Sequence, residues 1–191
     1  EEALNRSMQD YGGFDHNEQT VRVLTKLEQR YANFNGLNLS WETLEGVVKH
    51  QGVIKNREEV RPAITDIDLK LDLKLEHHSS AEAQLANLAD DIAYLSHDFD
   101  DALRAKLFTI DDIRLLPQVG SALANIENCH GRLDLARITH ELVRRLISVF
   151  VEDILLVSNA NLSSLGATHP DEIRHHKKPV ISFSADIAAD L

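Results

Sequence analysis

The stretch DLARITHELVRRLISVFVEDILLVSNANLSSLG, residues 134–166, decides the fold class. Asp134 can cap a helix, because its side-chain oxygen can accept a hydrogen bond from a backbone N–H of the first turn. Gly166 is of the residue type that most often ends a helix. Between them, apolar residues recur every three or four positions and predict one long amphipathic helix. These residues are Leu135, Ile138, Leu142, Leu146, Ile147, Phe150, Ile154 and Leu155.

Shorter segments on both sides carry the same periodicity, and each starts at a turn or a capping residue. Turn signals are sparse, with eight Gly and four Pro in 191 residues, so we predict an all-α fold. The chain lacks an initiator Met and has a helical pattern at both ends, so we expect a piece of a longer protein. The predicted helices cover residues 15–33 after Gly12-Gly13, the segment from Ser40 to near Gly52, residues 81–97 after Ser80, and a short stretch from Thr109 to Pro117.

One segment departs from helical periodicity. Between Asp66 and Glu76, Ile or Leu alternates strictly with Asp, Lys or Glu, which is the period of a half-buried strand. No second alternating run exists, and a single strand is not stable alone. We therefore expect a short extended or partly helical arm around residues 67–79. Beyond it, Thr168 opens a tail that has the composition of a surface connection.

The charge balance excludes some classes of partner. The chain has 20 Lys and Arg against 31 Asp and Glu, a net charge of −11. This argues against duplex nucleic acid or an anionic membrane surface as the main ligand. No run approaches the roughly 18 apolar residues of a membrane span. Cys129 is the single cysteine and cannot form an internal disulfide, which fits a reducing cytoplasm.

Residues 80–98, SAEAQLANLADDIAYLSHD, carry the most informative side chains. At about 100° per residue, Asp90, Tyr94, His97 and Asp98 lie on one side of the predicted helix. The opposite side is apolar, with Leu85, Leu88, Ile92 and Leu95. An ordinary solvated face is one interpretation. A solvated face usually includes Lys or Arg that pairs with acidic residues along the helix, and this stripe has none. The second interpretation is therefore a site that binds a divalent cation and a phosphate or sugar.

Several motifs in order identify a family. They resemble the bacterial deoxyguanosinetriphosphate triphosphohydrolase-like proteins of the HD superfamily, from Glu1 to about Phe183. The motifs are GFDHNEQT at 13–20, GLNLSWETLEGVVKH at 36–50, ADDIAY at 89–94, His97-Asp98, Asp100-Asp101 and HELVRRLI at 140–147. The resemblance implies an all-helical, HD-domain-like bundle and a metal-dependent enzyme that splits a deoxynucleoside triphosphate into deoxynucleoside and triphosphate.

The resemblance also implies roles for individual residues. In that family a His, a His-Asp pair and a distant Asp hold the metal, and only the last has a counterpart here, Asp90. The other ligands belong upstream of Glu1, and His97-Asp98 is not that pair. Glu1 resembles an acid that orients a catalytic His, which is expected just before Glu1. His16 resembles a His that faces the substrate. The residues implied on the substrate side are Lys49, His50, Asp91, Tyr94, His97 and Asp98.

Each of these roles has an ordinary structural alternative. His16 follows an acidic residue at a helix start and fits a surface histidine equally well. Lys49 near a helix C-terminus is favourable for reasons of the helix dipole alone. Arg144 and Arg145 more often serve subunit contacts or surface charge than phosphate binding.

We expect residues 1–166 to form part of an HD-type helical domain and residues 167–191 to form a connection and the start of a further region. The expected function is metal-dependent hydrolysis of a dGTP-like substrate with Mg²⁺ or Mn²⁺, in a cytoplasmic homo-oligomer that binds no membrane. With one of four metal ligands present, we expect this chain alone to bind metal weakly. The alternative is a non-catalytic helical interaction or assembly module.

Overall fold

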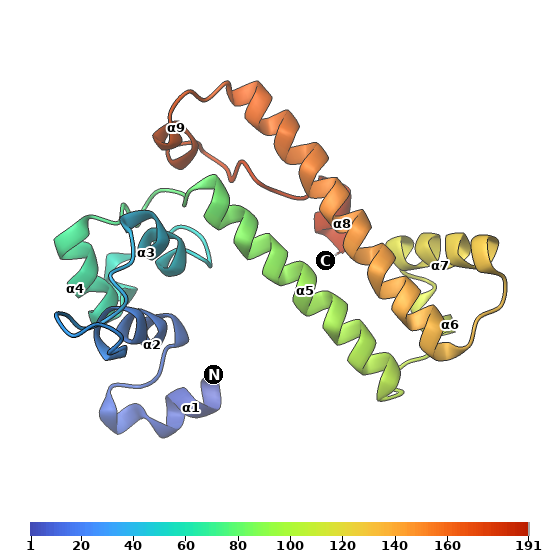
Figure 1. Ribbon diagram of the computed structural model, residues 1–191, viewed down its shortest axis with the longest axis horizontal. Helices are drawn as coiled ribbons and strands as arrows, with labels where there is room; N and C mark the ends of the chain where they lie inside the picture. Colours follow the sequence, from blue (N-terminus) through green and yellow to red (C-terminus); the bar gives the residue numbers. More distant parts are fainter. Residues whose placement is uncertain (191) are drawn as a thin grey trace. The chain divides into compact units, whose positions relative to one another are not determined.

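The computed structural model describes residues 1–190 and confirms the all-α prediction, with no β-strand among the described residues (Figure 1). Leu191, the last residue of the expected C-terminal region, lies outside them. Short 3-10 helices cover Gln9–Tyr11 and Arg57–Glu59, and a π-helix covers Val23–Leu27. The α-helices are α1 (Glu2–Ser7), α2 (His16–Arg22), α3 (Trp41–Val48), α4 (Pro62–Leu71), α5 (Ala81–Arg104), α6 (Ile110–Ile113), α7 (Pro117–His130), α8 (Leu135–Leu165), α9 (Pro170–Arg174) and α10 (Ala185–Asp190).

The capping residues predicted from the sequence act as predicted. The Asp134 carboxylate accepts a hydrogen bond from the Arg137 N–H at 2.9 Å, and Gly166 ends α8 in the left-handed conformation, with φ of 60°. The Ser40 hydroxyl accepts from the Thr43 N–H at the start of α3. Thr109 is the N-cap residue of α6 and forms a reciprocal capping box with Asp112. These bonds satisfy amide groups that helix ends otherwise leave unpaired.

The helix predicted over 15–33 ends earlier, at Leu27, because the chain folds back on its last turn. The Gly36 N–H donates to the Glu28 carbonyl at 2.7 Å, and the Leu37 N–H donates to the Leu24 carbonyl at 2.9 Å. Gly36 has φ of 79°, and an added Cβ would lie 2.6 Å from the Thr25 carbonyl oxygen. Only glycine combines this backbone conformation with so close an approach.

The alternating segment is helical as far as Leu71 and irregular beyond it. Helix α4 buries Ile64, Ile67 and Asp68, a spacing of three and four residues, so the period-2 pattern does not reflect a strand. Asp72 then adopts φ of 47° and turns the chain. Leu73 and Leu75, which follow this turn, are fully buried, at 0 % and 1 % exposed.

The chain divides into two compact units, and the first comprises Glu1–Gln84 and Ala167–Pro179. Helix α2 packs against α3 and α4. The Trp41 indole N–H donates to the Leu71 carbonyl at 2.9 Å, which ties the start of α3 to the end of α4. The core of unit 1 consists of Val21, Leu44, Val48, Ile64, Ile67, Leu73 and Leu75.

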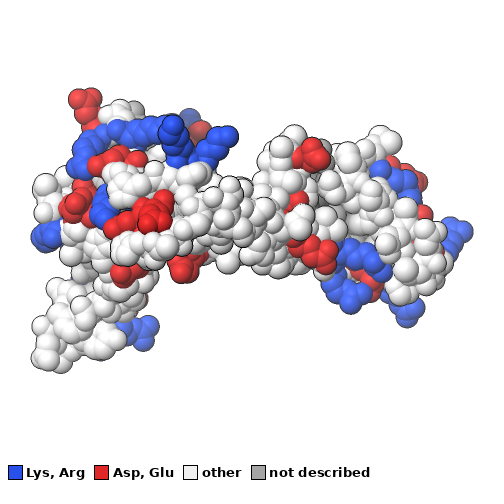
Figure 2. All heavy atoms as spheres, turned by 90° about the horizontal axis from the view of Figure 1, so that it is seen from above, with Lys and Arg blue, Asp and Glu red and all other residues white. Residues whose placement is uncertain are grey.

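The second unit comprises Leu85–Gly166 and the residues from Val180 onward. Helix α7 packs against α8. By length and composition α8 is the one helix of the described chain that could cross a membrane, with a mean hydropathy of 1.4 in its most apolar window. The side of α8 that carries Leu142, Leu146, Phe150 and Ile154 is buried, but only 22 % of its most apolar window is buried in the described chain. On the face shown in Figure 2, basic and acidic side chains lie next to one another, so neither sign dominates it.

Candidate functional site

Three of the predicted site residues meet in unit 1. The His16 Nδ1 lies 2.9 Å from the Glu1 Oε2, and the His16 backbone N–H donates to the Glu1 Oε1 at 3.0 Å. On the other side of the ring, the His16 Nε2 lies 3.2 Å from the His50 Nε2, with the two rings edge to face. The structure therefore joins Glu1, His16 and His50 in one line of hydrogen bonds.

Local structure at the ends of two helices positions these side chains. Asp15 caps α2 by accepting from the Glu18 N–H at 2.7 Å, which fixes His16 as the first helical residue. His50 follows α3, and its Nδ1 lies 2.9 Å from the Val47 carbonyl oxygen. The Asn17 side-chain amide donates to the Val48 carbonyl at 2.9 Å and so links the start of α2 to the end of α3.

The partners of the two histidines indicate where each ring can donate a hydrogen bond. The Glu1 carboxylate and the Val47 carbonyl can only accept, so the Nδ1 atoms of His16 and His50 must both donate. The contact between the two Nε2 atoms needs one further hydrogen. The two rings thus face each other through Nε2, and each faces an acceptor through Nδ1.

The contacts with His16 lower the pKa of the Glu1 carboxyl. The hydrogen bond from the His16 backbone N–H, followed by that from the His16 side chain, lowers the pKa of the Glu1 carboxyl below its usual value. Because this pKa is lower in the folded than in the unfolded protein, the contact stabilises the folded protein at pH values above the unfolded pKa. This stabilisation is lost as the pH falls through the folded-state pKa. The ionised form of Glu1 therefore persists throughout the neutral range.

Lys49, predicted to lie on the substrate side, is buried inside unit 1. It is 1 % exposed, and its ammonium group donates to the Glu45 carboxylate at 2.8 Å and to the carbonyls of Lys74, His77 and His78 at 3.0 to 3.3 Å. Burial lowers the pKa of Lys49, and the bond to Glu45 opposes that shift. In this arrangement Lys49 holds the loop after α4, and its contact with phosphate stays a prediction.

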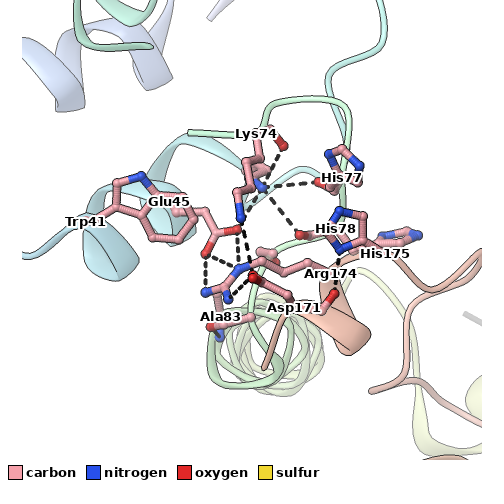
Figure 3. A network of polar contacts seen from close by, with 12 residues as sticks. Trp41, Glu45, Lys74, His77, His78, Ala83, Asp171, Arg174 and His175 are labelled. Carbon is pink, nitrogen blue, oxygen red and sulfur yellow. Dashed lines mark hydrogen bonds and ion pairs between the residues drawn. The ribbon is translucent and has the colours of Figure 1, made fainter. Parts of the chain in front are cut away.

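A third residue, Arg174, completes the buried cluster of Lys49 and Glu45, and no sequence pattern indicated it. Arg174 lies in the tail predicted as a surface connection, yet it is 6 % exposed (Figure 3). Its guanidinium pairs with Glu45 through Nε and Nη2, both at 2.9 Å, and with Asp171 at 3.2 Å. It also lies 4.9 Å from the centre of the Trp41 ring. Glu45 and Arg174 are 129 residues apart, so no local pattern could predict the contact.

The polar stripe of α5 lies in unit 2 and is exposed to solvent. Tyr94 is 69 % exposed, while Ile92 and Ser96 on the other side of the helix are buried. Leu88 and Leu95 are partly buried, whereas Leu85, expected on the apolar side, is 45 % exposed. All four residues of the stripe, Asp90, Tyr94, His97 and Asp98, are exposed, and so is the neighbouring Asp91.

Among the side chains that the structure describes, no three His, Cys, Asp or Glu residues come together in a way that could hold a metal ion. A carboxylate such as Asp90 suits a hard cation such as Mg²⁺, but catalytic metals usually have three or more protein ligands.

No family model matches the chain, but curated relatives do. The chain is 48 % identical over 189 residues to a protein of Bartonella tribocorum, 46 % over 194 to one of Caulobacter vibrioides and 45 % over 188 to one of Bradyrhizobium sp.. All three are named deoxyguanosinetriphosphate triphosphohydrolase-like protein. The matches cover 96–100 % of this chain and 47–49 % of each relative. The chain is thus homologous, over nearly its whole length, to about half of a deoxyguanosinetriphosphate triphosphohydrolase-like protein.

Proposed function

We propose that this chain is part of a deoxynucleoside triphosphate triphosphohydrolase, which converts a dGTP-like substrate and water into deoxynucleoside and triphosphate. The observation that carries the proposal is the identity of 45–48 % over almost the entire chain with relatives that bear this name. The hydrogen-bonded line of Glu1, His16 and His50 supports it, because it offers an acid suited to this reaction.

The chemistry requires a proton at the departing oxygen. Water attacks the α-phosphorus of the substrate, its oxygen becomes part of the released triphosphate, and a proton of the water passes to the solvent. The bond from that phosphorus to the 5′ oxygen of the deoxynucleoside breaks. The 5′ oxygen leaves with the electron pair of that bond and takes up a proton. A histidine pair that shares one proton can donate it there, as a general acid, while Glu1 holds the orientation of the His16 ring. In this proposal His16 faces the substrate, and His50 is the residue that shares its proton.

The proposed cofactor is a divalent cation, Mg²⁺ or Mn²⁺. When bound, such an ion neutralises phosphate charge and lowers the pKa of bound water. Asp90 would supply one ligand, and the remaining ligands would come from outside this chain. Asp91, Tyr94, His97 and Asp98, exposed on the same helix, are the proposed contacts to sugar and phosphate. A cytoplasmic homo-oligomer is part of the same proposal.

Replacement of His16 by glutamine is expected to lower kcat for triphosphate release from dGTP by at least about a hundredfold, the contribution of a positioned general acid. Glutamine keeps a hydrogen-bonding group in place but cannot carry the proton, so KM should change little. The assay uses the full-length protein that we expect to contain this chain. His130→Gln, at an exposed histidine that ends α7, is the matched control and should retain wild-type kcat. A wild-type kcat in His16→Gln would show that the histidine pair takes no part in the reaction.

A further inference from the structure

An apolar groove in unit 2 has no role in the function proposed above. Helices α5 and α8 form its two walls (Figure 1), and its volume is about 330 Å³. Its lining consists of Leu, Ile, Val and Ala side chains only. All of these residues belong to the second compact unit, so the groove is a feature of one body of the protein.

Most of the lining is open to solvent although it is apolar. Ile92 and Ile154 are buried. Beside them, Leu85 is 45 % exposed, Val151 is 41 % exposed and Leu155 is 54 % exposed. Single apolar side chains on a surface are ordinary, but a continuous apolar patch marks a surface that another element covers.

The length of the groove suits a helix as the covering element. On α5 the lining runs from Leu85 to Ala93, and on α8 it runs from Ile147 to Leu155. Each stretch rises by about 12 Å, or roughly two turns. The small side chains of Ala89 and Ala93 let a neighbouring backbone approach α5 closely. Grooves between helices typically receive the apolar side of an amphipathic helix, whose anchoring residues are three or four positions apart.

A lipid bilayer fits this surface less well than a helix does. Exposed carboxylates lie within the same turns as the groove residues, namely Glu152 on α8 and both Asp90 and Asp91 on α5. Ionised side chains are costly in the hydrocarbon region of a membrane. A protein helix contacts only the apolar side of α5 and α8, so it leaves these carboxylates in water.

A second copy of this chain is also a poor occupant. Each copy has a net charge of −11, so two copies repel one another. The relatives point to a different source, because the matched region covers only 47–49 % of each of them, and about as many residues again lie outside it. A helix in the same chain as the groove has an effective concentration in the millimolar range, which favours it over any separate molecule.

We propose that the groove between α5 and α8 binds an amphipathic helix from the part of the full-length protein that lies outside residues 1–191. This helix presents Leu, Ile, Val or similar side chains at positions three and four residues apart, and its charged side chains face away from the groove. The inference rests on the proposal that the chain is part of a longer protein, but it does not depend on the proposed reaction.

Stability of the full-length protein gives one test. Leu155→Asp places a carboxylate beneath the covering helix and should lower the thermal midpoint by at least about 5 °C, because a buried charge without a partner is costly. Leu156→Asp is the matched control, since Leu156 is 74 % exposed on the same helix and does not line the groove. It should leave the midpoint at the wild-type value. Equal midpoints for the two variants would contradict a covered groove.

Photo-cross-linking of the full-length protein identifies the occupant. Val151→p-benzoyl-phenylalanine places a photoreactive side chain in the groove, and Leu155→p-benzoyl-phenylalanine replaces it if that variant fails to fold. Mass spectrometry of the digested product should find the probe joined to a peptide of the same chain from outside residues 1–191. The same probe at Leu156, outside the groove, should give little of this product.

The cross-linked product also separates the other possible occupants. A peptide from within residues 1–191, of the same or of a second copy, would overturn the proposal, and so would a lipid adduct or the absence of any adduct. The readout requires no hydrolysis of dGTP. Failure of the proposed reaction and failure of the proposed docking are therefore distinguishable.

Discussion

Replacing Glu45 by glutamine is expected to lower the free energy of unfolding by about 3–5 kcal/mol, the usual cost of breaking a buried ion pair by removing one partner. Glu45 is fully buried and is the anion that both Lys49 and Arg174 contact. The neutral amide would leave two buried cations without their common counter-charge. It would also lose part of the bidentate bond to the guanidinium, since one amide atom donates rather than accepts.

Urea unfolding followed by fluorescence measures this effect directly, because Trp41 is the single tryptophan and lies against Arg174. Glu42→Gln, an exposed position on the same helix, is the control and should leave the unfolding midpoint close to that of the wild type. Adding Lys49→Met to Glu45→Gln removes one of the unpaired cations, so the double variant should regain part of the loss. Equal midpoints for Glu45→Gln and Glu42→Gln would show that the buried cluster does not stabilise unit 1.

Replacing Asp90 by alanine is expected to lower kcat of the full-length protein by at least about a thousandfold, because loss of a metal ligand removes several kcal/mol of transition-state stabilisation. Asp90 is exposed on α5, so no core contact is lost and the thermal midpoint should not change. Binding of Mn²⁺, measured by calorimetry, should weaken together with kcat.

Glu82→Ala is the control for Asp90→Ala, since it removes an exposed carboxylate from the first turn of the same helix. It should leave both kcat and Mn²⁺ affinity at wild-type values. Wild-type turnover in folded Asp90→Ala would exclude Asp90 from the ligand set. Loss of turnover with a lowered thermal midpoint would instead assign Asp90 a structural role.

Local signals account for the parts of the fold that the sequence predicted. The caps at Asp134, Ser40 and Thr109 act within three residues, and the apolar periodicity of α8 marks the side that is buried. The alternating segment is partly helical, because α4 buries one part of it and the irregular loop after Asp72 buries another. A period of two therefore arose from two different local structures.

The contacts that assemble the candidate site could not be predicted, because they join residues far apart in the sequence. Glu1, His16 and His50 were each singled out, but the contact between the two histidines joins positions 34 residues apart and follows from the packing of α2 against α3. No role was predicted for Asn17, although it lies next to His16. An amide oxygen without a hydrogen-bond partner can be recognised only once the neighbouring atoms are known. The contact of Arg174 with Glu45 was not predicted either, because the two residues are 129 positions apart.

The most direct test of the proposed function is the identity of the products formed from dGTP. The full-length protein is incubated with dGTP and Mg²⁺ or Mn²⁺, and ³¹P NMR and chromatography follow the phosphorus and the nucleoside. Our account predicts one inorganic triphosphate for each deoxyguanosine released, and almost no turnover by the 191-residue chain alone. Release of orthophosphate or pyrophosphate, or no hydrolysis by the full-length protein, would contradict it.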